Sequence, residues 1–237
     1  MALALGAPPT TAIAKVVADN LAADVRGFGN KTTCGITGLA WMLPQLEKYG
    51  HGELALAILK GDSYPSLGHM AAQNMTTLCE NWACTAHDAG GGSGNHIMLG
   101  GFDPFLHQSI GGLDSAVSGE TGGWERIIVR VAPTAIATLG GASNTHETRF
   151  GTVSLSWRYQ GGQLVMALVV PVGSTAEVHA PTVLAGRALT RMHEGQTVLW
   201  SDAAGVAALD AWSVELRESA VVATVGSGTY AFAAQYQ

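Results

Sequence analysis

The residues of this chain that could carry out chemistry are concentrated between positions 61 and 99, in GDSYPSLGHMAAQNMTTLCENWACTAHDAGGGSGNHIML. One carboxylate, Glu80, and one histidine, His96, occur there among residue types that line sugar-binding sites. Hydrolysis of a glycosidic bond generally uses two carboxyl groups, of which one protonates the leaving oxygen and the other acts as nucleophile or activates water. Glu80 is a candidate for the second role. Residue type alone would favour a helix cap or a surface partner for Glu80 and a structural role for His96.

Helices are predicted on both sides of this segment. Residues 10 to 25 follow a threonine and repeat apolar residues at helical intervals, which predicts an amphipathic helix with Ile13, Val16, Val17, Leu21 and Val25 on its buried face. A second helix is predicted from about Gly38 to Tyr49 and a third from about Glu53 to Leu59, as an antiparallel hairpin around GHG. The second helix should bury Leu39, Met42, Leu43 and Leu46. Residues 87 to 101 lack periodicity and predict a loop, and a short helix is expected to begin at Asp103 and Pro104.

The second half of the chain has the pattern of strands. After about Gly112 the sequence consists of short β-branched runs separated by turn residues, which is typical of an antiparallel β-sandwich. Within TVSLSWRY, apolar residues alternate with Ser154, Ser156 and Arg158, so the strand should have one buried and one solvated face. YQGGQ is predicted to form the hairpin turn to the next strand.

Two groups of motifs resemble one known family. Residues 35 to 60, GITGLAWMLPQLEKYGHGELALAILK, together with 61 to 99 resemble the last part of the catalytic barrel of bacterial-type α-L-rhamnosidases, glycoside hydrolase family 78. GWERIIVRVAP, RFGTVSLSWRY, VVPVGSTAEVHAP and VGSGTYAF resemble the C-terminal β-sandwich of the same family in order and spacing. The resemblance implies a multidomain chain, α then β. Residues 1–115 would be the C-terminal portion of an (α/α)6 glycosidase barrel, and residues 116–237 an antiparallel β-sandwich domain.

The resemblance also implies roles for individual residues. Glu80, in TTLCENW, occupies the motif position of the general base of an inverting reaction, and His96, in SGNH, that of a histidine contacting rhamnose. The remaining substrate-binding residues that it implies are Asp62, Tyr64, Trp82 and Asn95. The family usually has tryptophan where this chain has Leu67 and Cys79. Because aromatic rings supply apolar area against a sugar, we expect weaker binding, an altered sugar preference or lost function.

The activity implied is inverting hydrolysis of terminal α-L-rhamnosides without a cofactor. In the family the general acid lies upstream, in a half of the barrel that this chain does not include, so we expect a fragment or truncated member that is weak or inactive alone. An alternative is a non-catalytic carbohydrate-binding or subunit-like protein, whose uncovered barrel wall would need a second copy or a chain supplying the missing helices. A third alternative is an incomplete gene product without a function of its own.

Composition narrows the classes of partner. The 237 residues are 47% hydrophobic and carry a net charge of −6, which excludes a cationic surface for nucleic acid or anionic lipid. We expect no signal peptide, no membrane-spanning segment, and a cytoplasmic rather than a secreted protein. Three cysteines are an odd number, which argues against a disulfide framework. Cys79, Cys84 and His87 could suggest zinc, but a structural site needs a fourth ligand, so no metal is expected.

Overall fold

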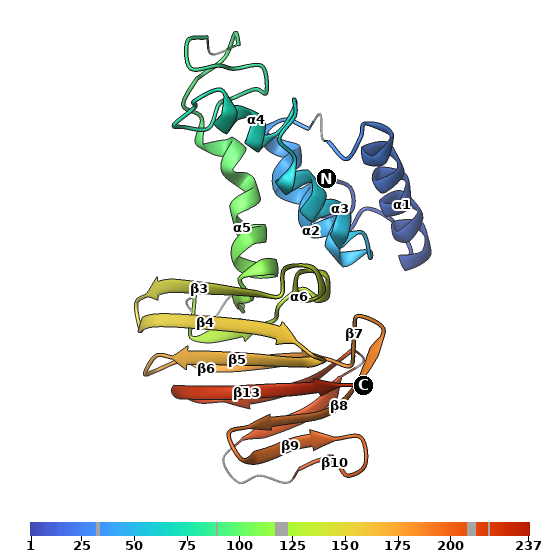
Figure 1. The fold of residues 1–237 in the computed structure, drawn as a ribbon, viewed down its shortest axis with the longest axis vertical. Coiled ribbons are helices and arrows are strands. Elements are labelled where there is room, and N and C mark those ends of the chain that lie inside the picture. Colours follow the sequence, from blue (N-terminus) through green and yellow to red (C-terminus); the bar gives the residue numbers. More distant parts are fainter. Residues whose placement is uncertain (32–33, 89, 117–122, 208–211, 218) are drawn as a thin grey trace. The chain divides into compact units, whose positions relative to one another are not determined.

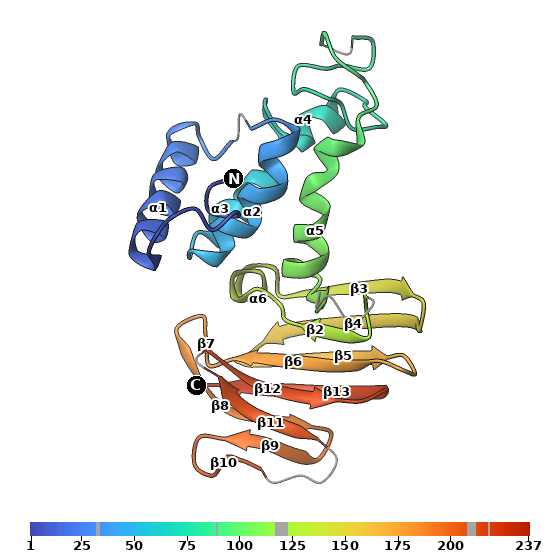
Figure 2. The same cartoon turned by 180° about the vertical axis from the view of Figure 1, so that it is seen from behind.

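The computed structural model describes residues 1–31, 34–88, 90–116, 123–207, 212–217 and 219–237. The chain forms two compact units, Met1–Phe105 and Leu106–Gln237 (Figures 1 and 2). The first unit is helical, and the second consists mainly of strands. This confirms the predicted order of a helical part followed by a β-sandwich. The division lies N-terminal to the domain boundary predicted from the sequence, so that β1 (Leu113–Ser115) belongs to the sandwich unit.

The described part of the first unit contains six helices of the α and 3-10 types, and side chains cap the first and the fourth of them. The six helices are α1 (Thr11–Gly27), α2 (Ile36–Lys48), α3 (Gly52–Lys60), α4 (Leu67–Ala72), the 3-10 helix η1 (Ile97–Phe102) and α5 (Asp103–Phe105). Thr10 caps α1, because its hydroxyl oxygen accepts a hydrogen bond from the Ile13 N–H at 3.2 Å. Both helices of the predicted hairpin, α2 and α3, are present, and α2 buries the predicted row of Leu39, Met42, Leu43 and Leu46.

The buried face of α1 differs from the predicted one. Ile13 and Val16 are 45% and 58% exposed, and the helix instead buries Ala14, Ala18, Ala22 and Val25. Alanines four residues apart form a narrow row on one side of a helix. Leu3 packs against this row at Ala14 and Ala18, together with the partly buried Val17 and Tyr49. The helix was therefore predicted correctly, and so was the burial of Val25, but Ile13 and Val16 were wrongly placed on its core-facing side.

The second unit is a two-sheet sandwich. One sheet has the strand order β1-β2-β6-β12-β11 and the other β10-β9-β8-β13-β5-β4-β3, with β7 pairing with β8. The strands of the first sheet are β1, β2 (Arg126–Val129), β6 (Thr175–Pro181), β12 (Ala220–Val225) and β11 (Ser213–Arg217). Those of the second are β3 (Gly141–Thr148), β4 (Gly151–Gln160), β5 (Gln163–Val170), β7 (Val183–Leu184), β8 (Arg187–Glu194), β9 (Thr197–Ser201), β10 (Gly205–Val206) and β13 (Gly228–Tyr236). The described pairs are antiparallel except that of β2 with β6.

The sandwich core is made by alternating residues of both sheets. In β4, Val153, Leu155 and Trp157 are buried and the residues between them face solvent, as predicted. They share one core with residues of the other sheet such as Val178 in β6. The hairpin turn is also confirmed, since Gln160 pairs with Gln163 across two glycines that both have positive φ. Two helices of this unit, η2 (Leu106–Ile110) and α6 (Pro133–Leu139), complete it.

Candidate functional site

Glu80 and His96 lie on two chain segments that pair with each other, residues 77–84 and 90–96. The Glu80 N–H donates to the Ser93 carbonyl oxygen at 2.9 Å, and the His96 N–H donates to the Leu78 carbonyl oxygen at 2.6 Å. The Thr77 hydroxyl donates to the Gly94 carbonyl oxygen at 2.7 Å. These hydrogen bonds therefore hold the two segments that carry the principal candidates side by side within one loop structure.

A disulfide encloses Glu80. Cys79 and Cys84 are bonded to each other and are 0% and 1% exposed. The odd number of cysteines was expected to argue against disulfides. This expectation needs correction, because an odd number excludes the pairing of all cysteines but allows one local bridge. Cys34 lies outside this bridge. The disulfide uses both sulfur atoms of the zinc cluster considered above, Cys79, Cys84 and His87. The described residues contain no group of three His, Cys, Asp or Glu that could hold a metal.

The carboxylate of Glu80 is exposed but anchored at one oxygen. Its Oε2 accepts a hydrogen bond from the Ser93 N–H at 2.9 Å. The loop packs closely here, since a Cβ added to Gly92 would lie 3.0 Å from the same oxygen and 2.8 Å from Asn81 Nδ2. Among the described residues no hydrogen-bond donor reaches the second oxygen, Oε1. The hydrogen bond from Ser93 can hold the Glu80 carboxylate in one orientation toward solvent, as a catalytic base requires. It can equally have a structural role in stabilising the loop.

The loop contains further interactions that the sequence did not reveal. Asn81 Nδ2 donates to the Gly90 carbonyl oxygen at 3.1 Å, and Asn81 Oδ1 accepts from the Ala83 N–H at 3.2 Å. The Ser93 hydroxyl donates to the Asn95 carbonyl oxygen at 3.0 Å. The only sequence signal for these contacts is the SGN run beside the glycines, because asparagine and serine often bond neighbouring backbone groups in turns.

The sugar-contact candidates His96 and Asn95 differ in burial. His96 is half-buried, and its Nδ1 is buried with no hydrogen-bond partner among the described residues. Asn95 is exposed. Buried polar atoms normally have partners, so the Nδ1 of His96 is an exception among the described residues.

Trp82 is held inside the helical unit. It is 9% exposed, and its Nε1–H donates to the Cys34 carbonyl oxygen at 2.8 Å. This bond ties the disulfide loop to the chain that precedes α2. Trp82 thus has a packing role, and its contact with a substrate stays a prediction.

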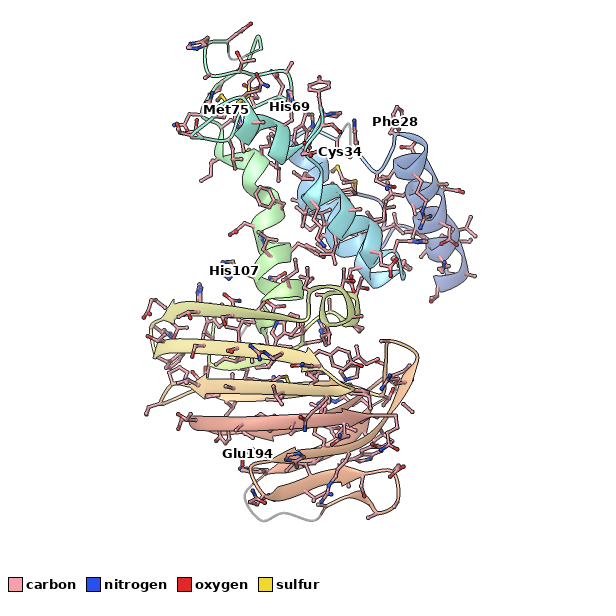
Figure 3. The ribbon with its side chains drawn as sticks, in the orientation of Figure 1. Phe28, Cys34, His69, Met75, His107 and Glu194 are labelled. Atoms are coloured by element: carbon pink, nitrogen blue, oxygen red, sulfur yellow. A yellow bond between two sulfur atoms is a disulfide. The ribbon has the colours of Figure 1, made fainter. Side chains whose placement is uncertain are left out.

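Asp62 and Tyr64 lie on the separate loop that leads into α4. Asp62 is exposed, Tyr64 is 52% exposed, and its ring meets His69 edge-to-face with centroids 5.5 Å apart. Ser66 caps α4, a helix that the sequence did not predict, by accepting from the His69 N–H at 3.0 Å. Figure 3 shows His69 on the helical unit. Among the described residues no hydrogen bond or ion pair joins Asp62 or the Tyr64 side chain to Glu80 or His96, and their shared role in one site stays a prediction.

The two units correspond to two known domains. Residues 1–110 match the bacterial alpha-L-rhamnosidase 6 hairpin glycosidase domain, and residues 115–193 match the bacterial alpha-L-rhamnosidase C-terminal domain. Fold and motifs thus define a protein of the six-hairpin glycosidase class with a C-terminal β-sandwich. The chain belongs to the bacterial α-L-rhamnosidase family of glycoside hydrolases.

Curated relatives and solved structures agree with this assignment. An alpha-L-rhamnosidase of Streptomyces avermitilis is 28% identical over 175 residues, which are 72% of this chain and 16% of that protein. One of Formosa agariphila is 28% identical over 158 residues, which are 65% of this chain and 16% of that protein. The chain therefore spans about a sixth of the length of these relatives.

Among solved structures, the alpha-L-rhamnosidase of Dictyoglumus thermophilum superposes with a TM-score of 0.73 at 28% identity, over 89% of this chain and 22% of that one. The Streptomyces avermitilis enzyme, solved with L-rhamnose, superposes with a TM-score of 0.72 at 23% identity, over 94% and 20% of the two chains. The second comparison supports the fold alone.

No described helix is long and apolar enough to cross a membrane.

Proposed function

We propose that the chain provides the general-base side of an α-L-rhamnosidase active site and acts in inverting hydrolysis of terminal α-L-rhamnosides. Residues 1–115 would form the barrel portion that carries the site, and residues 116–237 the sandwich domain. The observation that carries the proposal is the pairing of the Glu80 and His96 segments, with Glu80 anchored by the Ser93 N–H at 2.9 Å.

The anchored carboxylate suits the role of a base. A hydrogen bond from a backbone N–H to one carboxylate oxygen restricts rotation of the group and leaves the other oxygen available to accept a proton. Glu80 Oε1 would take that proton from a water molecule as the water attacks the anomeric carbon. His96 and Asn95, on the paired segment, would contact the sugar.

The reaction requires a second carboxyl. In inverting glycosidases the two carboxyl groups are ~6.5–9.5 Å apart, which leaves room for the attacking water. We propose that the general acid comes from barrel residues outside this 237-residue sequence, on the same polypeptide or on another chain. The sequence tested alone should then turn over a rhamnoside slowly or not at all.

A second candidate function, non-catalytic carbohydrate binding, is favoured by one observation. Cys79, at a position where the family usually has tryptophan, is buried in the disulfide and cannot contact a sugar ring. Leu67, at the other such position, begins α4 and is half-buried. The chain would then keep a rhamnose-binding surface without turnover.

The test measures both turnover and binding. The chain, its Glu80→Gln variant and a matched Glu53→Gln control at the exposed start of α3 are assayed with an aryl α-L-rhamnoside. L-rhamnose binding is followed by NMR on the same samples. Turnover of the rhamnoside that is lost only in Glu80→Gln would support the base but contradict the proposed external acid, because an acid would then lie within this chain.

Binding of L-rhamnose without turnover of the rhamnoside supports the second candidate or a missing acid. Adding the remaining barrel decides between them, because hydrolysis of the rhamnoside should then appear only if the acid was missing. If this chain neither binds L-rhamnose nor hydrolyses the rhamnoside, and Glu80→Gln does not affect hydrolysis after the remaining barrel is supplied, the proposal is wrong.

A further inference from the structure

A cavity of about 690 Å³ lies on the outer face of the five-stranded sheet. In β6 the residues Ala176, Val178 and Ala180 are buried in the core, so His179 and Pro181 belong to the opposite face. This face is built on β2, β6, β12 and β11, which Figure 2 labels. The volume of the cavity is within the range of binding sites for small organic molecules.

Among the charged groups around the cavity, one arginine forms no ion pair with any other described residue. Glu177 accepts hydrogen bonds from Arg126 at 3.1 Å and Arg217 at 2.8 Å, and Arg217 also donates to Glu215 at 2.7 Å. Arg130, which is exposed and lines the cavity, has no ion pair among the described residues. Among the described residues the outer face of this sheet carries three arginines and three carboxylates, Asp114, Glu177 and Glu215, so Arg130 is distinguished by its lack of an ion pair and not by a net positive charge of the face.

The histidine of the cavity contributes no charge near neutral pH. Burial, followed by repulsion from Arg130 and Arg217, lowers the pKa of His179 to about 4, although Glu177 opposes the shift. Its Nε2 lies 3.7 Å from Glu177 Oε2, beyond hydrogen-bonding distance. His179 therefore presents a neutral ring to the cavity, and the positive charge comes from Arg130.

The rest of the lining is suited to a sugar ring rather than a bare ion. Pro133, Pro181 and Val183 provide an apolar surface, and Thr182 and Ser219 provide hydroxyl groups. The backbone holds these groups in place, because the Thr182 N–H donates to the Ser219 carbonyl oxygen at 2.8 Å and the Arg130 N–H donates to the Gly112 carbonyl oxygen at 2.9 Å. Apolar area, hydroxyl groups and one guanidinium match a ring that has a C–H face, hydroxyls and a single carboxylate.

We propose that this cavity binds a carboxylate-bearing monosaccharide, a hexuronate, whose carboxylate pairs with Arg130. Its hydroxyl groups bond Thr182 and Ser219, and its C–H face packs on Pro133 and Pro181. The site lies entirely within the sandwich unit and does not depend on Glu80. It goes beyond the proposed hydrolysis by assigning a separate acidic-sugar subsite to the C-terminal domain.

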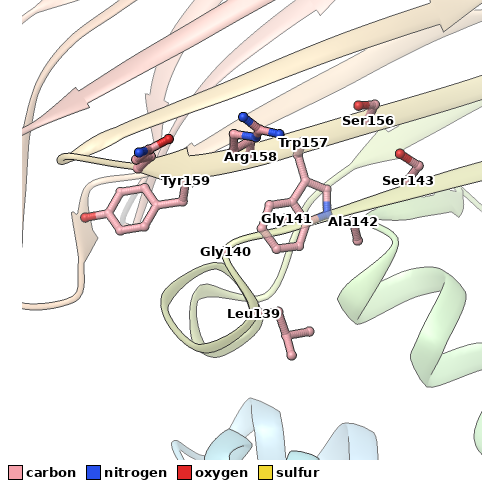
Figure 4. A pocket seen from close by; sticks show the side chains of 10 residues that line it. Leu139, Gly140, Gly141, Ala142, Ser143, Ser156, Trp157, Arg158 and Tyr159 are labelled. Atoms are coloured by element: carbon pink, nitrogen blue, oxygen red, sulfur yellow. The ribbon is translucent and has the colours of Figure 1, made fainter.

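A smaller cavity beside α6 supplies the control. It has a volume of about 570 Å³ and is lined by Arg158, among other residues of β3 and β4 (Figure 4). Arg158 is an exposed arginine of the same unit that lies outside the proposed site. Arg158→Gln therefore removes the same charge from the chain as Arg130→Gln does.

The experiment titrates the 237-residue chain with D-glucuronate, D-glucose and inorganic phosphate, observed by amide NMR. We expect D-glucuronate to shift the amides of Thr182 and Val183. Arg130→Gln should weaken its binding about tenfold or more, because a hydrogen bond to a charged group is lost. Arg158→Gln should leave it unchanged.

Three results of the titrations with the unmodified chain would overturn the proposal. They are no shift of these amides with D-glucuronate, equal binding of D-glucose, and binding by phosphate as tight as by D-glucuronate, which would indicate a simple anion site. Equal weakening by Arg130→Gln and Arg158→Gln would also overturn it, as an effect of net charge. Far-UV circular dichroism of both variants verifies that the sandwich is folded.

Discussion

Breaking the disulfide between Cys79 and Cys84 should destabilise the helical unit and loosen the loop that carries Glu80. The bridge joins residues five positions apart. For a closed loop of about six residues, the loop-entropy relation gives about 2 kcal/mol of stabilisation. Because both cysteines are buried, their replacement by alanine adds a small packing loss, so reduction of the wild-type chain is the cleaner perturbation.

The loosening should be visible at named amides. The bridge constrains the segment 77–84 itself, and this segment is joined to residues 90–96 by hydrogen bonds that include those from the Glu80 N–H to Ser93 and from the His96 N–H to Leu78. Loss of the constraint should therefore let these bonds open more often. We expect dithiothreitol to lower the unfolding free energy of the helical unit by about 2 kcal/mol, measured by urea denaturation with circular dichroism at 222 nm. Hydrogen exchange of the Glu80 and His96 amides should accelerate in parallel.

Cysteine variants provide the controls. The double variant Cys79→Ala/Cys84→Ala should not respond to dithiothreitol, whereas Cys34→Ala should respond as the wild type does. The reasoning is refuted if a thiol assay of the denatured wild-type chain, prepared without reductant, detects three free thiols instead of one. It is also refuted if reduction leaves both the urea midpoint and the exchange rates unchanged.

Three further substitutions or titrations test other contacts. Gly92→Ala should lower the unfolding free energy by about 1–3 kcal/mol, because the added Cβ would crowd the Glu80 carboxylate at 3.0 Å; urea denaturation measures it. Trp82→Phe should cost about 1–2 kcal/mol in the same assay, since the Cys34 carbonyl loses its donor at 2.8 Å. His179 should titrate with a pKa of about 4 by NMR of its ring protons. Because the unfolded side chain has a pKa of about 6.5 and binds the proton first, the unfolding free energy should fall as the pH drops from about 6.5 to about 4.

Each of these predictions has a matched reference. Gly27→Ala, where an added Cβ meets nothing within 4 Å, should not destabilise α1, and Trp41→Phe at an exposed tryptophan should cost less than Trp82→Phe. Equal effects within either pair would contradict the contacts described. A His179→Gln variant should lack this histidine's part of the pH dependence, and a ring pKa near 6.5 in the folded wild type would contradict its burial.

The sequence predicted best those elements whose residues follow one strong pattern. The α2 row of Leu39, Met42, Leu43 and Leu46 and the alternation in β4 are such patterns, because large apolar residues at a fixed period have one way to be buried. The face of α1 was predicted wrongly at Ile13 and Val16, because alanine gives a weaker signal than these larger residues and the packing of Leu3 is needed to reveal the alanine row.

Other elements depend on contacts that no local pattern records. β3, GASNTHET, is mostly polar and is a strand because β4 pairs along its full length. α6 stands between β-branched runs and was not predicted. For the site, the sequence motifs identified Glu80 and His96, but the pairing of their segments and the bridge around Glu80 arise from long-range geometry. The roles of these residues in catalysis stay predictions.

The single parallel pair of the sandwich has a consequence for how this domain folds. β2 pairs with β6 at Ile127 and Ala176, while β3, β4 and β5 between them belong to the opposite sheet. The β4–β5 hairpin closes through a two-residue turn and can form locally, but β2 and β6 meet only after the intervening meander has brought their ends together. Pairing between residues distant in the sequence loses chain entropy before stabilising contacts form, so such pairs form slowly. The sheet that carries the Arg130 cavity should therefore be completed last, after the meander of the other sheet has formed.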